Sequence, residues 1–185
     1  MNKLFIRARY RTAFFAGLAC FGSSGPLIAK PMAELPRATS PETLLALHNE
    51  ERARLSLPPL SWDTKLANDA SLYARKLANE NKFEHAPQSP GDDAQGENLW
   101  MGTRGFYQSK DMVGSWIEER EFIRAGTFPN ISSTGDWTDV GHYTQLISTK
   151  TKYVGCGLQQ NAQDEYLVCR YFPAGNEYGE VISVK

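Results

Sequence analysis

The sequence predicts an α+β fold, and two patterns support this class. Over three stretches after residue 40, apolar residues recur at the spacing of helices that bury one face. Near the end of the chain, two segments rich in Tyr, Val and Leu flank a short polar turn, which indicates a β-hairpin. Helical runs followed by paired strands are typical of α+β domains.

The first 29 residues have the pattern of a secretory signal peptide. Residues 1–11 hold four basic side chains and no acidic one, an apolar segment follows at 12–22, and small or aliphatic residues precede a cleavage point after Ala29. Eleven apolar residues are too few to cross a bilayer as a helix, so an uncleaved anchor is the weaker alternative. Cys20 leaves a lipid anchor as a second alternative, although Gly17 stands where a lipobox has an aliphatic residue.

We therefore predict an exported protein, secreted or periplasmic, whose mature form has no membrane-spanning segment. Cleavage after Ala29 leaves 156 residues with 16 basic and 21 acidic side chains. Residues 30–40 are predicted to be a linker and residues 41–185 a single domain, which is long enough to bury a core. Mild acidity without a basic stripe argues against nucleic acid as a partner.

The first helix is predicted to begin at Ser40-Pro41. A hydroxyl can cap the first turn, and proline at the first helical position lacks only an N–H that the helix would not use. Apolar residues continue the pattern to about Leu55, and the prolines of residues 57–60 end it.

Three further helical segments and two loops follow along the chain. A second helix is predicted from Ser61 or Asp63 to about Asn81, a third over residues 109–123 and a short helical turn over 142–147. Turn-forming residues fill the segments 87–95 and 126–139. His48 is interpreted as a packing or capping contact, and a set of large aromatic residues as core and not as a ligand platform: Trp62, Tyr73, Trp100 and Trp116.

The hairpin is predicted from residues 152–159 and 165–172. Cys156 and Cys169 lie at equal distances from the centre of the turn between them, and residues so placed face each other across the strands. A disulfide is therefore predicted, which would stabilise the fold by about 3 kcal/mol through its short loop. Two free buried thiols are the alternative.

Five motifs, in the order of one known family, give the chain a strong resemblance to the CAP superfamily, also called the SCP or pathogenesis-related 1 family. The resemblance covers about residues 41–179 and implies a three-layer α-β-α sandwich with a central, largely antiparallel sheet. The motifs are Leu47-His48-Asn49 through Arg52, Pro58-Pro59-Leu60-Ser61-Trp62-Asp63, Gly96-Glu97-Asn98-Leu99, Gly141–Ile147, and the run from Cys169 to Asn176.

The resemblance also implies a cleft lined by two histidines and two glutamates. Residue by residue, these are His85, Glu97, Glu119 and His142. Glu119 is chosen because it lies three residues after Trp116, and the adjacent Glu118 is the residue with which it could be confused. Imidazole and carboxylate suit a divalent cation, zinc first, with His85 and His142 as its ligands.

Three interpretations of these four residues stay open. They could form a hydrogen-bonded cluster that braces loops, they could hold the cation, or a histidine beside a carboxylate could act as a general base. No nucleophile motif accompanies them, so no catalytic residue is assigned.

We expect a non-enzymatic binding protein for a small lipid-like or extended ligand, because the resemblance implies sterols or fatty acids as the first class to test. The alternatives are a metal-assisted hydrolase of peptides or envelope polymers, and a cell-surface or host-interaction protein with an incidental cleft.

Overall fold

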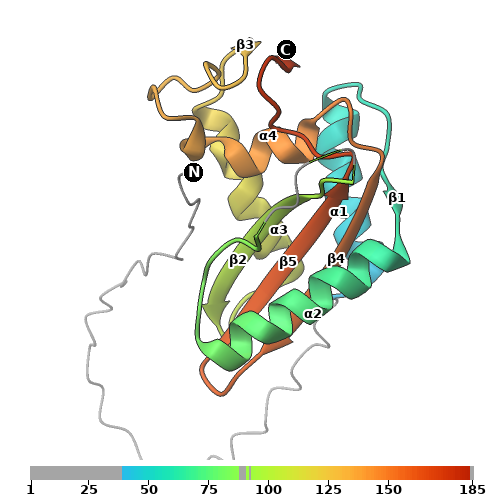
Figure 1. Cartoon of the computed structure of the whole chain (residues 1–185), viewed down its shortest axis with the longest axis vertical. Helices are drawn as coiled ribbons and strands as arrows, with labels where there is room; N and C mark the ends of the chain where they lie inside the picture. The colour runs from blue at the N-terminus through green and yellow to red at the C-terminus, as the bar shows by residue number, and fades with distance from the viewer. Residues whose placement is uncertain (1–38, 88–90, 92, 184–185) are drawn as a thin grey trace, which may run out of the picture.

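A four-stranded sheet forms the centre of the molecule (Figure 1). The computed structural model describes residues 39–87, 91 and 93–183, so the predicted signal peptide lies outside the described residues. The strand order is β1-β4-β5-β2, and only the β1–β4 pair is parallel. The strands are β1 (Ser61–Trp62), β2 (Gly96–Thr103), β4 (Tyr153–Gln160) and β5 (Asp164–Phe172).

Helices cover both faces of this sheet, which confirms the predicted three-layer α+β sandwich. One long helix lies along one face, against β4 and β5, and the other helices gather on the opposite face (Figure 1). The long helix is α2 (Thr64–Glu80), and the opposite layer holds α1 (Pro41–Arg54), α3 (Ser109–Glu118) and α4 (Gly141–Ile147).

The helix ends follow the predicted capping residues. The Ser40 hydroxyl accepts a hydrogen bond from the Thr43 amide at 3.2 Å, and Pro41 is the first residue of α1. The Asp63 carboxylate accepts from the Leu66 amide at 2.8 Å, so the second helix starts after Asp63. Ser61, the other predicted start, is wrong, because it pairs with β4 as part of a strand.

The hairpin has the predicted register. Cys156 faces Cys169 across β4 and β5, and the two form a disulfide with their Cα atoms 4.1 Å apart. The prediction of a disulfide is therefore confirmed. Both cysteines lie on the face covered by α1 and α3, within the larger of two hydrophobic clusters.

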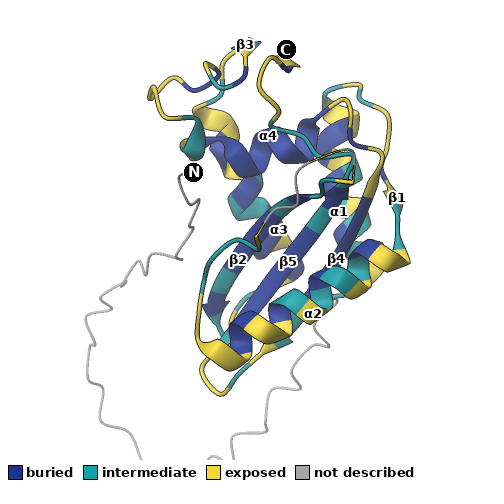
Figure 2. Ribbon diagram, viewed as in Figure 1, coloured by how far each residue is buried: buried dark blue, intermediate teal, exposed yellow. Residues whose placement is uncertain are grey.

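The two clusters lie on opposite faces of the sheet, and their buried residues appear along β2, β4 and β5 in Figure 2. Trp100 and Trp116 are buried in the larger one, while Trp62 and Tyr73 are half-buried against the clusters, as predicted for core aromatics. The smaller cluster, under α2, is made of Ala70, Ala74, Leu77, Ala78, Leu99, Tyr166 and Val168.

Other segments differ from the sequence predictions. The third helix ends at Glu118 instead of residue 123, and the residues that follow it form a 3₁₀ turn, η1 (Glu119–Glu121). The strand β2 was not predicted at all. The loop segment 126–139 contains further short elements: β3 (Gly126–Thr127), which pairs with β6 (Val181–Ile182), and η2 (Trp137–Asp139). Among the described residues, no helix is both long and apolar enough to span a bilayer.

Two glycines let α2 lie directly on β4. A Cβ atom at Gly155 would overlap the backbone of Asp63 and Ala67, and one at Gly157 would overlap the backbone of Ser71. A side chain at either position would therefore push the helix away from the sheet.

We predict that Gly157→Ala destabilises the fold by about 1–3 kcal/mol, because the added methyl group overpacks a backbone contact that cannot move alone. The matched control is Gly114→Ala inside α3, where a Cβ atom has open space. That change should instead stabilise by about 0.5–1 kcal/mol through helix propensity. Urea unfolding of both variants measures the difference, and equal effects would contradict the close approach of α2.

Candidate functional site

The four residues implied by the family resemblance form two histidine–glutamate pairs. In the buried pair, His142 Nδ1 lies 2.5 Å from Glu119 Oε1. In the outer pair, His85 Nδ1 lies 2.7 Å from Glu97 Oε1. No three ligand atoms of these residues lie within 4.8 Å of one another in the described part of the chain. The structure therefore shows two pairs and not one closed cluster.

The buried pair is held at the start of α4. Glu119 lies in η1, and its Oε2 atom accepts hydrogen bonds from the backbone amides of His142 at 2.9 Å and Tyr143 at 3.0 Å. A carboxylate at this end of a helix satisfies amides that have no helical partner and complements the helix dipole. Trp116 lies parallel to the His142 ring, with ring centroids 6.0 Å apart. The pair is therefore fixed by backbone contacts, side-chain pairing and packing.

His142 presents one nitrogen without a partner. Its side chain is 1% exposed, and Nε2 is a buried atom with no hydrogen bond to any described residue. Because the Glu119 carboxylate can only accept from Nδ1–H, the neutral ring carries its lone pair on Nε2. A carboxylate behind Nδ1 is also the arrangement that orients metal-binding histidines. Nε2 is thus available to a cation or to a proton.

The carboxylate of the outer pair comes from the other face of β2, which is the edge strand of the sheet. Successive side chains of a strand point to opposite faces, so Glu97 points toward the α2 layer and Asn98 toward α4. Glu97 Oε1 also accepts from the Ala86 amide at 3.0 Å. The Glu97 side chain is 1% exposed and that of His85 is 27% exposed. His85 is therefore the member of the four that solvent reaches.

Arg170 is a site residue that the sequence prediction missed. It is the register partner of Glu97 on β5, and its Nη2 atom lies 2.8 Å from Glu97 Oε2, as an ion pair without hydrogen-bond alignment. Its guanidinium also lies 5.4 Å from the ring centroid of Tyr73 and donates to Gln95 at 3.2 Å. The positive charge of Arg170 balances the negative charge of the Glu97 carboxylate, which is almost completely shielded from solvent. Recognition of β2 as the neighbour of β5 would have predicted this pair.

Both glutamates are held by contacts with the protein, although Glu97 Oε2 meets Arg170 without a hydrogen bond. The oxygens of Glu97 face His85, Ala86 and Arg170. Those of Glu119 face His142 and the first amides of α4. The carboxylates are thus placed to orient the imidazoles, and Nε2 of buried His142 has no hydrogen-bond partner among the described residues.

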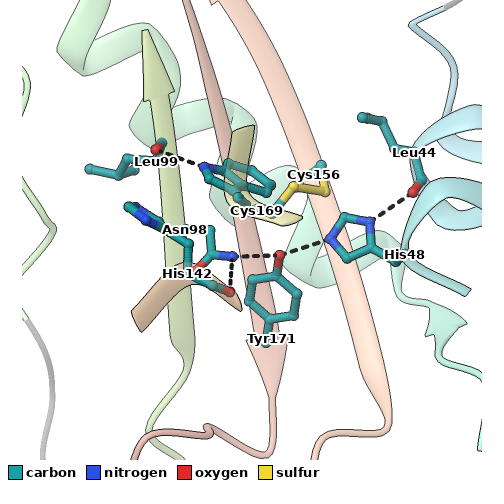
Figure 3. Close-up of a disulfide and its surroundings, with 9 residues drawn as sticks. Leu44, His48, Asn98, Leu99, His142, Cys156, Cys169 and Tyr171 are labelled. Carbon is teal, nitrogen blue, oxygen red and sulfur yellow. Dashed lines mark hydrogen bonds between the residues drawn. A yellow bond between two sulfur atoms is a disulfide. The ribbon is translucent and has the colours of Figure 1, made fainter. Parts of the chain in front are cut away.

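Asn98 connects the buried pair to the interior. Its side-chain amide donates to the His142 carbonyl at 3.0 Å and to the Tyr171 hydroxyl at 3.2 Å, and that hydroxyl lies 2.8 Å from His48 Nε2 (Figure 3). His48 Nδ1 is 2.7 Å from the Leu44 carbonyl. Burial lowers the pKa of His48 to about 4, so this ring is neutral and serves packing and hydrogen bonding, as predicted.

Glu51 of α1 braces the buried pair from outside. It is 5% exposed and accepts from the Tyr143 hydroxyl at 2.8 Å, from Arg54 at 2.7 Å and from Arg120 at 3.4 Å. Tyr143 follows His142 in the chain, and Arg120 follows Glu119. Burial alone would raise the pKa of Glu51, but the hydrogen bonds from Arg54 and Tyr143 outweigh burial and lower it.

Most of the chain is similar to one protein family and to its known members. The model of the Cysteine-rich secretory protein family, CAP, matches residues 45–171. Pathogenesis-related protein PR-1 of Medicago truncatula is 33% identical over 71% of this chain and 72% of its own. Venom allergen 5 of Brachyponera chinensis is 31% identical over 78% of this chain and 84% of its own.

Solved structures share the fold. The crystal structure of NaASP2 with Zn2+ has a TM-score of 0.63 at 22% identity, and covers 78% of this chain and 85% of its own. The venom allergen-like protein 4 of Schistosoma mansoni has a TM-score of 0.58 at 21% identity, with 78% and 94% covered.

We predict that Glu51→Gln lowers the free energy of unfolding by about 1.5–3 kcal/mol near neutral pH, because charge-assisted hydrogen bonds are lost. The Glu51 pKa is lower in the folded state, so its carboxylate stabilises the protein above the ordinary value of 4.5. That contribution is lost as pH falls through the folded pKa, so the difference between the variant and the wild type should shrink in acid.

The matched control is Glu50→Gln, one residue earlier on α1, where the side chain is exposed. Its effect should stay within about 0.5 kcal/mol at every pH. Denaturant unfolding across pH measures both variants. A constant Glu51→Gln effect down to strong acid would contradict the charged role of Glu51.

Proposed function

Because this chain belongs to the CAP family, the Cysteine-rich secretory protein family, we propose that it is an exported, non-enzymatic binding protein that holds a divalent cation through His85 and His142. The observation that carries the proposal is the unpartnered Nε2 of buried His142, with Glu119 behind its other nitrogen. His85 repeats the arrangement with Glu97.

The donor chemistry favours zinc first. Neutral imidazole is a good ligand for zinc, and a carboxylate bonded to its other nitrogen makes the ring more basic and fixes its orientation. Two protein nitrogens leave coordination positions for water or for a ligand oxygen. A bound cation would supply a Lewis acid that attracts the polar end of a ligand.

Export rests on two observations. The first is the signal-peptide pattern of residues 1–29. The second is the Cys156–Cys169 disulfide, because disulfides persist mainly in oxidising compartments outside the cytosol.

A small lipid-like ligand is the second part of the proposal. An apolar groove opens where α1 and α4 end, beside β6, and it supports this ligand class. One of its lining residues is Ile147, which is five residues along α4 from His142, or about 7.5 Å of helical rise. Its lining residues are Leu55, Leu57, Ile147, Thr149, Val181, Ile182 and Ser183.

We predict that zinc raises the melting temperature of the wild type, with about 2.7 kcal/mol of stabilisation at a hundredfold excess over the dissociation constant. His142→Ala and His85→Ala should each lose most of this stabilisation. Glu119→Gln should weaken zinc binding by about 10–100-fold, because it removes the group that orients His142.

The control for Glu119 is Glu118→Gln, which changes an exposed neighbour and should leave zinc binding unchanged. Calorimetric titration measures all four variants. Zinc binding that survives the His85→Ala, His142→Ala double variant would refute the proposed ligands. Zinc-dependent turnover of a peptide substrate that His142→Ala abolishes would instead establish the hydrolase alternative.

We predict that Val181→Asp weakens binding of a fluorescent fatty acid or sterol by at least about tenfold, because a charge next to a buried alkyl chain is costly. The control is Leu72→Asp on α2, since Leu72 is 65% exposed and Val181 is 66% exposed, but only Val181 lines the groove. Displacement titration with unlabelled lipid measures affinity. Equal losses in both variants, or saturable binding in neither the wild type nor the control, would exclude the groove as the lipid site.

A further inference from the structure

A second group of potential metal ligands lies in the core, away from the two histidine–glutamate pairs. His48, Cys156 and Cys169 each offer one ligand atom, and these atoms all lie within 4.8 Å of one another. In the described part of the chain, no other three His, Cys, Asp or Glu side chains meet this distance. The residues come from α1, β4 and β5 and are 0%, 7% and 0% exposed (Figure 3).

In the structure the two sulfurs are bonded to each other, so neither is a thiolate that could bind a metal. Reduction by a dithiol changes this. The protein disulfide accepts two electrons and two protons and becomes two thiols, while the reductant becomes a cyclic disulfide. Two thiols that then bind Zn²⁺ release two protons.

We propose that reduction of the Cys156–Cys169 disulfide turns this cluster into a zinc-binding site made of two thiolates and the His48 imidazole. Disulfide and metal are then mutually exclusive states of the same three residues. The inference is independent of the cation site proposed at His85 and His142.

The geometry suits zinc once the sulfur–sulfur bond is open. With zinc–sulfur and zinc–nitrogen bonds of about 2.0–2.3 Å, tetrahedral ligand atoms are about 3.5–3.8 Å apart. The three ligand atoms already lie within 4.8 Å of one another, and the two sulfurs must move apart from bonding distance to reach this spacing. The charge also suits a buried site, because two thiolates and a neutral imidazole around Zn²⁺ sum to zero. An uncompensated charge there would carry a large desolvation cost.

His48 already has the tautomer and the fixed ring orientation of a histidine that binds a metal. Its Nδ1–H donates to the Leu44 carbonyl at 2.7 Å, which fixes the ring and leaves the lone pair on Nε2. The one present partner of Nε2 is the Tyr171 hydroxyl at 2.8 Å. This hydroxyl donates to Nε2 and therefore competes with a metal for that nitrogen.

Cobalt is the probe that tests this site, because thiolate ligands give Co²⁺ an ultraviolet sulfur-to-metal charge-transfer band that histidine ligands do not. The folded protein is reduced with a dithiol, desalted without oxygen, checked for two free thiols and titrated with Co²⁺. The oxidised protein is the control, and any cobalt that it binds at His85 and His142 lacks the sulfur band. Failure of the earlier cation proposal is thus seen separately, in the oxidised sample.

The expected result is a saturable charge-transfer band in the reduced protein alone. His48→Gln should weaken cobalt binding by at least about tenfold, since even loss of an outer-shell partner costs 10–100-fold. Tyr171→Phe, which keeps the ring and removes the competing hydroxyl, should tighten it.

Four results would overturn the inference. One is the absence of the band in protein with two free thiols. Another is equal affinity in a His48→Gln variant whose near-ultraviolet circular dichroism is native. If His48→Gln fails to fold, the Tyr171→Phe variant provides the test. Cobalt affinity that is equal to or weaker than that of the wild type would then contradict the site. Should reduction itself loosen the fold, added metal must restore the native dichroism, and failure to do so also counts against the site.

Discussion

The register of β5 between its two neighbours is the constraint on which the rest of the structure depends. It sets Arg170 opposite Glu97 on one face and Cys169 opposite Cys156 and Asn98 on the other. Side chains alternate along a strand, so a shift by one residue would exchange the two faces. The ion pair, the disulfide and the hydrogen bond that holds the His142 carbonyl would then be lost together.

The two histidine–glutamate pairs differ in what holds them. Glu119 and His142 are tied to backbone amides at the start of α4 and braced by Glu51 from α1, so their geometry is set by three elements. His85 lies in the loop before β2 and relies on one carboxylate. A ligand that engages both would meet one rigid, buried donor and one that solvent can reach.

Much of the fold follows from local signals in the sequence. Ser40-Pro41 and Asp63 mark helix starts because capping is a local interaction, and the position of two cysteines about a turn defines a hairpin. The family resemblance supplied the layer order. The strand β2 lacked a signal because it is covered on both faces, so its residues do not alternate between apolar and polar.

The candidate site was only partly predictable for the same reason. The four residue types came from motif resemblance, but their separation into two pairs depends on which face of β2 each side chain takes. Arg170 and Glu51 were missed because each acts through a partner far away in the chain. The third helix ends at Glu118, earlier than predicted, and the carboxylate of the next residue, Glu119, caps the start of α4.

The glycines of β4 have an effect beyond the packing contact itself. The backbone of α2 lies against Gly155 and Gly157, and small alanines make up much of the cluster beneath this helix, so its side of the sheet buries less apolar surface than the side with the tryptophans. The α2 layer should therefore open first in local fluctuations, and its amides should exchange with deuterium before those of α3. Such an opening uncovers Arg170 and the outer pair while the buried pair stays closed, so the two halves of the site would sample solvent on different timescales.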